Sequence, residues 1–241
     1  MIPPPRTPDG QRIYVIGDIH GRHDLLRRMH GLIMDDSSGS GAVAKTVLYL
    51  GDYVDRGPES FEIVDTLIDR PLSGFDHVFL KGNHEDMLLR FLENGECADI
   101  WLSNGGAETL RSYGIDADPF SWTPSSVCAL RDAFRAALPD IHLGFFRGLE
   151  HHRVFGDYVF VHAGLRPGID LDGQHGRDLM WIRHEFLQWE SPFPGVVVHG
   201  HSIAPQPEFR ANRIGIDTGA YRSGRLTCLI LEGTERRILQ T

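Results

Sequence analysis

Short apolar runs alternate with amphipathic stretches over the first hundred residues. Residues 13–16, 46–50 and 77–80 are rich in β-branched, aliphatic and aromatic side chains, which predicts three buried strands. Apolar residues at helical spacing follow each run; these are Leu25, Leu26, Met29, Leu32 and Ile33, then Phe61, Val64, Leu67 and Ile68, then Met87, Leu88, Phe91 and Leu92. Strands that alternate with helices predict an α/β protein with a largely parallel sheet covered by helices.

The pattern becomes mainly helical and less regular from about residue 97 to residue 148, with several glycine and proline breaks. This indicates a cap-like insertion within one catalytic domain that spans residues 1–241. Strand patterns return at 158–161, 196–198, 214–216 and 226–231. Their close spacing predicts antiparallel pairing.

Composition excludes some classes of protein. The chain has 24 Lys and Arg against 33 Asp and Glu, a net charge of −9, and no basic block, so we expect neither nucleic acid nor a membrane as partner. The 3 cysteines form no CxxC pair, and the N-terminal residues lack the apolar stretch of a secretory signal. We therefore expect a cytoplasmic protein.

Polar residues of one kind follow five of the predicted strands. The segments are Gly17–Gly21, Gly51–Gly57, Gly82–Glu85, Val161–Gly164 and His199–His201. Ligands of α/β sheets bind at the carboxyl ends of the strands, so these segments can converge. Asp, Asn and His without thiolate suit Mn, Fe or Zn.

Each segment alone also has an ordinary structural interpretation. Gly-Asp after a strand is often only a turn, and a lone His162 on an apolar strand is usually a hydrogen-bonded core residue. The five together favour a metal site, because so many buried carboxylates and imidazoles need compensating cations or hydrogen bonds.

Three motifs then resemble a known family. GDIHG at 17–21, GDYVDRG at 51–57 and GNHE at 82–85 resemble the metal-dependent serine/threonine phosphoprotein phosphatases, within the calcineurin-like metallophosphoesterases. MWIR at 180–183 and WLSNGGAETLRSY at 101–113 resemble the bacterial and phage branch. The resemblance implies the calcineurin-like fold, a β-sandwich of mixed sheets flanked by helices.

The resemblance also implies two divalent metal ions, Mn²⁺ first and Fe or Zn as alternatives. It assigns Asp18, His20 and Asp52 to one ion. It assigns Asp52, Asn83, His162 and His201 to the other, so that Asp52 bridges. Spacing alone does not choose between His199 and His201, and the Gly-His-Ser/Thr pattern of the family favours His201.

The implied mechanism is direct attack on phosphorus by a hydroxide that bridges the metal ions, without a phosphoenzyme. Arg56, Arg183 and Asn83 would bind the phosphate. His84 would protonate the leaving alkoxide while Asp55 holds its other ring nitrogen. Alternatively, each arginine is an ordinary surface residue.

Glu85 and Asp217 have two interpretations, either orienting a ligand histidine or capping a turn or helix.

The leading function is a protein serine/threonine phosphatase whose partner is a phosphorylated protein or peptide. The first alternative is hydrolysis of diadenosine tetraphosphate; in that branch alanine looks to match Asp55, and Asp usually follows Asn-His where this chain has Glu85. The second alternative is a non-catalytic phosphate-binding scaffold.

Overall fold

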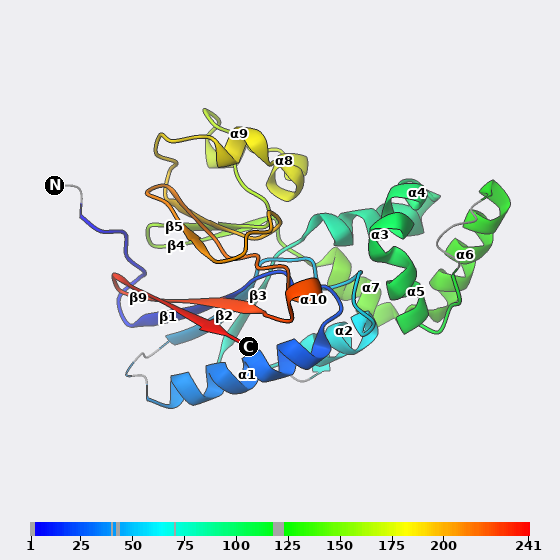
Figure 1. The fold of residues 1–241 in the computed structure, drawn as a ribbon, viewed down its shortest axis with the longest axis horizontal. Coiled ribbons are helices and arrows are strands. Elements are labelled where there is room, and N and C mark those ends of the chain that lie inside the picture. Colours follow the sequence, from blue (N-terminus) through cyan, green and yellow to red (C-terminus); the bar gives the residue numbers. More distant parts are fainter. Residues whose placement is uncertain (1–2, 40, 42–43, 70, 118–122) are drawn as a thin grey trace.

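Two five-stranded mixed sheets pack face to face in this computed structural model, which describes residues 3–39, 41, 44–69, 71–117 and 123–241 (Figure 1). The first sheet has the order β10 (Glu235–Gln240), β9 (Thr227–Glu232), β1 (Gln11–Ile16), β2 (Ala44–Tyr49), β3 (Asp76–Phe79). Strands β1, β2 and β3 are parallel, as their alternation with helices predicts. Strand β9 is antiparallel to β1, and β10 is antiparallel to β9. In the register of β1 with β9, Ile13 pairs with Leu231.

The second sheet has the order β4 (His152–Phe155), β5 (Tyr158–Val161), β6 (Val196–His199), β8 (Arg213–Gly215), β7 (Glu208–Phe209). The prediction of antiparallel pairing is wrong for β5, β6 and β8, which are parallel. The chain returns to the start of β6 through α8 (Gly176–Trp181) and α9 (His184–Leu187), a crossover long enough for parallel pairing. Antiparallel pairing holds for β9, and at the edges of the second sheet for β4 and β7.

Helices cover the outer face of each sheet (Figure 1). Helices α1 (His23–Ser38) and α2 (Ser60–Asp69) pack on the first sheet, and α8 and α9 pack on the second. Alternation along β1 divides its side chains between two layers. Val15 points into the core between the sheets, and Tyr14 points into the core beneath the helices.

The segment predicted as a cap-like insertion lies at one end of the sandwich (Figure 1). It follows α3 (Asn83–Asn94) and contains α4 (Ala98–Trp101), a π-helical segment (Leu102–Gly106), α5 (Ala107–Ser112), α6 (Pro124–Ala137) and α7 (Asp140–Arg147). Its residues 118–122 lie outside the described part of the chain. The Trp101 ring is fully buried, and its centroid lies 4.7 Å from the ring centroid of Phe91 in α3 and 5.9 Å from that of Phe134 in α6. Trp101 therefore packs the insertion against the rest of the domain.

Two short elements complete the described chain, a 3₁₀ turn (Leu171–Gly173) and α10 (Ala220–Ser223). None of the helices in the described ranges combines the length and apolarity needed to cross a membrane.

Candidate metal and phosphate site

The carboxyl ends of the parallel strands from both sheets meet at one edge of the sandwich. The first sheet brings Asp18 and His20 after β1, Asp52 after β2, and Asn83 at the start of α3; the second brings His162 after β5 and His201 after β6. All six side chains are between 0% and 5% exposed. The structure therefore brings together the six residues predicted as metal ligands.

The backbone at this edge is strained. Five residues other than glycine have φ between 48° and 72°, in the left-handed region; they are His20, Asp52, Asp55, Arg56 and His201. Glycines allow close approach, since a Cβ at Gly200 would overlap Asp18 and a Cβ at Gly82 would overlap Asp52. The glycines of the motifs thus make room for the carboxylates.

Asp52 lies at the centre of two groups of possible metal ligands. Its carboxylate oxygens lie 3.4 Å from Nε2 of His20 and 3.4 Å from Nε2 of His162. Ligand atoms of Asp52, His162 and His201 lie within 4.8 Å of one another, and so do those of Asp52, His20 and His84. Neither group includes Asp18, whose Oδ2 accepts a hydrogen bond from the His201 backbone N–H at 2.9 Å.

Unpaired polar atoms test whether these residues fit a metal. Four buried side-chain atoms lack a hydrogen-bond partner across the described ranges, and three belong to this site: Asp18 Oδ1, His20 Nε2 and His201 Nε2. A buried polar atom without a partner costs about 1–3 kcal/mol. His20 Nδ1 donates to the Val54 carbonyl at 2.9 Å, which leaves the Nε2 lone pair free for a cation. The donor set therefore fits divalent cations that prefer oxygen and imidazole nitrogen.

Burial and nearby charges shift the pKa values of the site histidines in different directions. Burial lowers the pKa of His201 to about 2 and holds the pKa of His20 well below its ordinary value, so both rings are neutral. Burial opposes a charge on His162 as well, but Asp52 and Asp18 raise its pKa to about 10. Burial and Asp217 hold the pKa of Asp18 well above its ordinary value. The Asp18 carboxylate therefore needs a positive neighbour to stay ionised.

His84 is held from two sides. Its Nδ1 lies 2.6 Å from Oδ2 of Asp55, and its Nε2 lies 3.1 Å from the Arg56 guanidinium. A guanidinium only donates, so Nε2 accepts and the ring carries its proton on Nδ1. Burial opposes protonation of His84, but the charges of Asp52 and Asp55 raise its pKa.

Residues of the insertion hold Asp55. The Trp101 indole N–H donates to Oδ2 at 3.0 Å, and the Thr109 hydroxyl donates to Oδ1 at 2.6 Å. Sequence reasoning missed both contacts. Trp101 and Thr109 lie in the stretch that resembles the bacterial branch, but they are 46 and 54 positions from Asp55, and local spacing does not predict such a contact.

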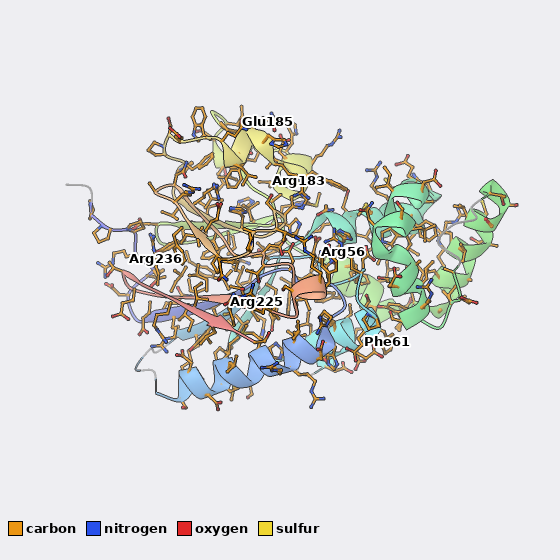
Figure 2. The ribbon with its side chains drawn as sticks, viewed as in Figure 1. Arg56, Phe61, Arg183, Glu185, Arg225 and Arg236 are labelled. Atoms are coloured by element: carbon orange, nitrogen blue, oxygen red, sulfur yellow. The ribbon has the colours of Figure 1, made fainter. Side chains whose placement is uncertain are left out.

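The two predicted phosphate-binding arginines lie near the strand ends (Figure 2). The Arg56 guanidinium lies over the Tyr221 ring, 4.7 Å from its centroid. Arg183 is exposed beside α9, and its guanidinium donates to the His201 carbonyl at 3.0 Å. Among the described residues neither arginine makes a salt bridge, and the hydrogen bonds of their guanidiniums go to neutral acceptors, so no carboxylate would compete with a phosphate for either charge.

Glu85, His199 and Asp217 contact the backbone or the hydrophobic core. The Glu85 carboxylate accepts hydrogen bonds from the backbone N–H groups of Asp52, Tyr53, Val54 and Gly82, so it shapes a loop and caps α3. Burial and the Asp52 charge raise the pKa of Glu85 to about 7. His199 packs edge to face on Phe186 in the core, and Asp217 accepts from the Gly219 N–H at 2.8 Å. No hydrogen bond among the described residues links Glu85 or Asp217 to a predicted ligand histidine.

Comparison with known proteins decides the family. The family model of calcineurin-like phosphoesterases matches residues 11–225. The chain belongs to this family. Because it belongs to this family, the protein is a phosphoesterase, a hydrolase. The calcineurin-like phosphoesterases use divalent metal ions, and the buried Asp and His residues of this chain are the groups that could bind them.

Calcineurin-like relatives of two activities cover nearly the whole chain. Serine/threonine-protein phosphatase 2 of Escherichia coli is 28% identical over 231 residues, 90% of this chain and 91% of its own. The asymmetrical bis(5′-nucleosyl)-tetraphosphatase PrpE of Anoxybacillus flavithermus is 25% identical over 240 residues, 89% of this chain and 88% of its own.

Solved structures share the fold. A putative diadenosine tetraphosphatase matches with a TM-score of 0.63 at 22% identity, over 95% of this chain and 93% of that one. A metallophosphoesterase from Sphaerobacter thermophilus matches with a TM-score of 0.54 at 16% identity, over 95% and 87% of the two chains. The predicted calcineurin-like fold is therefore confirmed.

Proposed function

We propose that the protein hydrolyses phosphoserine and phosphothreonine monoesters of proteins or peptides. The observation that carries this proposal is the buried His84–Asp55 pair, joined at 2.6 Å beside Asp52. Serine and threonine leave as strongly basic alkoxides, so their departure needs a proton donor near the bridging oxygen. A polyphosphate leaves as a stable anion and needs no such donor.

The metal assignment is part of the same proposal. Two divalent ions, Mn²⁺ first, would bind Asp18, His20 and Asp52 on one side and Asp52, Asn83, His162 and His201 on the other. When bound, such ions activate water and neutralise charge on the phosphoryl group. Three buried atoms without partners support this assignment.

The side chains around the ions divide the remaining work. Arg56 and Arg183 bind phosphoryl oxygens, and Asn83 adds an amide donor. When Arg56 donates to the phosphate, it releases Nε2 of His84. His84 then carries a proton at Nε2 and gives it to the leaving oxygen, while Asp55 holds Nδ1.

A second candidate is asymmetrical hydrolysis of a dinucleoside tetraphosphate. It is favoured by the PrpE relative, which is 25% identical over 89% of this chain. In that reaction His84 would have little to contribute, because nucleotide leaving groups depart without protonation.

The deciding experiment compares turnover of a phosphothreonine peptide and of diadenosine tetraphosphate by the same Mn²⁺-loaded preparation. We expect kcat/KM for the peptide to be at least about tenfold higher, and we expect EDTA to stop both reactions. Preference for diadenosine tetraphosphate would replace the first proposal with the second. Hydrolysis of neither substrate, with no phosphate released from the peptide and no ATP or AMP formed from diadenosine tetraphosphate, would leave a phosphate-binding scaffold.

A further inference from the structure

We propose that Trp101 and Thr109 of the helical insertion are positioning residues for acid catalysis. They act through Asp55, which holds His84, so the inference rests on the proposed role of His84 as the acid. The helical insertion would then help to orient the side chain that donates the proton.

The Asp55 carboxylate has donors on both oxygens. The Trp101 indole N–H lies 3.0 Å from Oδ2 and 3.2 Å from Oδ1. Oδ2 is also the oxygen that accepts from His84, so the indole holds the atom that fixes the imidazole. Trp101 is fully buried between Phe91 and Phe134, and its ring has no room to turn away.

Thr109 holds both the side chain and the backbone of Asp55. Its hydroxyl donates to Oδ1 at 2.6 Å and accepts from the Asp55 N–H at 2.9 Å. The Ser60 hydroxyl, 3.1 Å from that of Thr109, completes the network. Asp55 and Thr109 are both 0% exposed, so water cannot replace a lost partner.

The same segment contacts Arg56. The Arg56 N–H donates to the Gly105 carbonyl at 3.3 Å, and a Cβ at Gly105 would overlap the Arg56 backbone. Asp55 and Arg56 both have left-handed backbone conformations, with φ of 72° and 70°. Such strain persists only where surrounding contacts fix it, and three of those contacts come from the insertion.

The chemical consequence depends on the leaving group. A His84 ring that has lost its fixed Asp55 partner would point its Nε2 poorly at the leaving oxygen. Loss of alignment would slow the departure of a basic leaving group and would spare one that needs no proton. A purely structural contact would affect both leaving groups alike.

The test measures kcat of Mn²⁺-loaded variants on phenyl phosphate, which needs the acid, and on p-nitrophenyl phosphate, which releases a stable anion. We expect Thr109→Val to lower kcat on phenyl phosphate about tenfold and on p-nitrophenyl phosphate less than about twofold. Trp101→Phe should follow the same pattern. Thr109→Ser keeps the hydroxyl and should restore the rate on phenyl phosphate.

Two reference variants separate the possible failures. Tyr113→Phe removes a hydrogen bond to His142 elsewhere in the insertion and should leave the ratio of the two rates unchanged. If His84→Asn lowers the phenyl phosphate rate but Thr109→Val does not, or if Thr109→Val lowers both rates equally, the positioning role is wrong. If His84→Asn itself leaves that rate unchanged, the proposed acid is wrong and the positioning role falls with it.

Discussion

The guanidinium of Arg56 lies 3.1 Å from Nε2 of His84, the ring nitrogen opposite the one that contacts Asp55. Because a guanidinium only donates, this contact and a proton on Nε2 exclude each other. A bound phosphate would compete for the guanidinium. The proposed phosphate-binding arginine and the proposed acid are therefore coupled by a single contact.

Substitution His84→Asn should lower kcat about 100-fold on a phosphothreonine peptide and change KM little. The reason is that a proton delivered only in the transition state affects turnover and not substrate binding. Steady-state kinetics with Mn²⁺ would measure it. An unchanged kcat would remove His84 from the reaction.

Tyr221→Ala should raise KM for p-nitrophenyl phosphate about fivefold, because Arg56 loses the ring on which its guanidinium lies at 4.7 Å. Tyr221→Phe keeps the ring and should keep KM. A titration of initial rate against substrate concentration distinguishes the two variants. Equal KM values for Ala and Phe would mean that the ring does not position Arg56.

Adding Mn²⁺ to protein treated with a chelator should raise Tm. At a hundredfold excess over Kd the stabilisation is about 2.7 kcal/mol, or about 5–10 °C for a chain of this size. Asp18→Asn should reduce the shift, because it removes a buried carboxylate from the site. Asp99→Asn, an exposed residue of α4, is the matched control and should show the full shift.

Glu85→Gln should lower the free energy of unfolding by about 2 kcal/mol, because an amide nitrogen would face backbone N–H groups that now donate to a carboxylate. Urea unfolding followed by circular dichroism would measure it. The control is Glu93→Gln, an exposed position of the same helix, which should cost less than about 0.5 kcal/mol. Similar losses in the two variants would contradict the role of Glu85.

Stability should fall as the pH decreases through the range in which His30 is protonated only in the unfolded chain. Burial lowers the pKa of His30 to about 4, from an ordinary value of 6.5. The neutral folded ring therefore stabilises the protein above pH 6.5, and this contribution is lost as pH falls toward 4. In His30→Gln the fall in unfolding free energy over that interval should be smaller, as urea titrations would show. If the unfolding free energy of His30→Gln fell with pH as steeply as that of the wild type, His30 would not be the source of the pH dependence.

Much of the fold could be predicted because its signals are local. The apolar run at 13–16 and the helical face from Leu25 to Ile33 correspond to β1 and α1. The parallel pairing of β5 with β6 could not be read from strand spacing, because α8 and α9 form the crossover between these two strands. Topology depends on what the connections pack against, and periodicity does not encode that.

The residues of the site likewise fall into those that local motifs indicate and those that depend on the tertiary fold. Motifs at strand ends indicated Asp18, Asp52 and His162, because a parallel sheet brings the carboxyl ends of its strands together. The contacts of Asp55 with Trp101 and Thr109 span 46 and 54 positions and depend on how the insertion folds. The predicted roles of the metal ligands, of Arg56 and of Arg183 remain predictions; the Asp18 variant tests one metal ligand, and the Tyr221 variants test the position of Arg56.

The central position of β1 has a consequence for the order in which the chain can fold during synthesis. Strand β1 pairs on one side with β2 and on the other with β9, so Ile13 gains its partner Leu231 only after the chain between them has been synthesised. Non-local pairing of this kind is slow, and one edge of β1 stays exposed until β9 has left the ribosome. The nascent protein therefore carries its catalytic motifs long before it has the sheet that holds them in place.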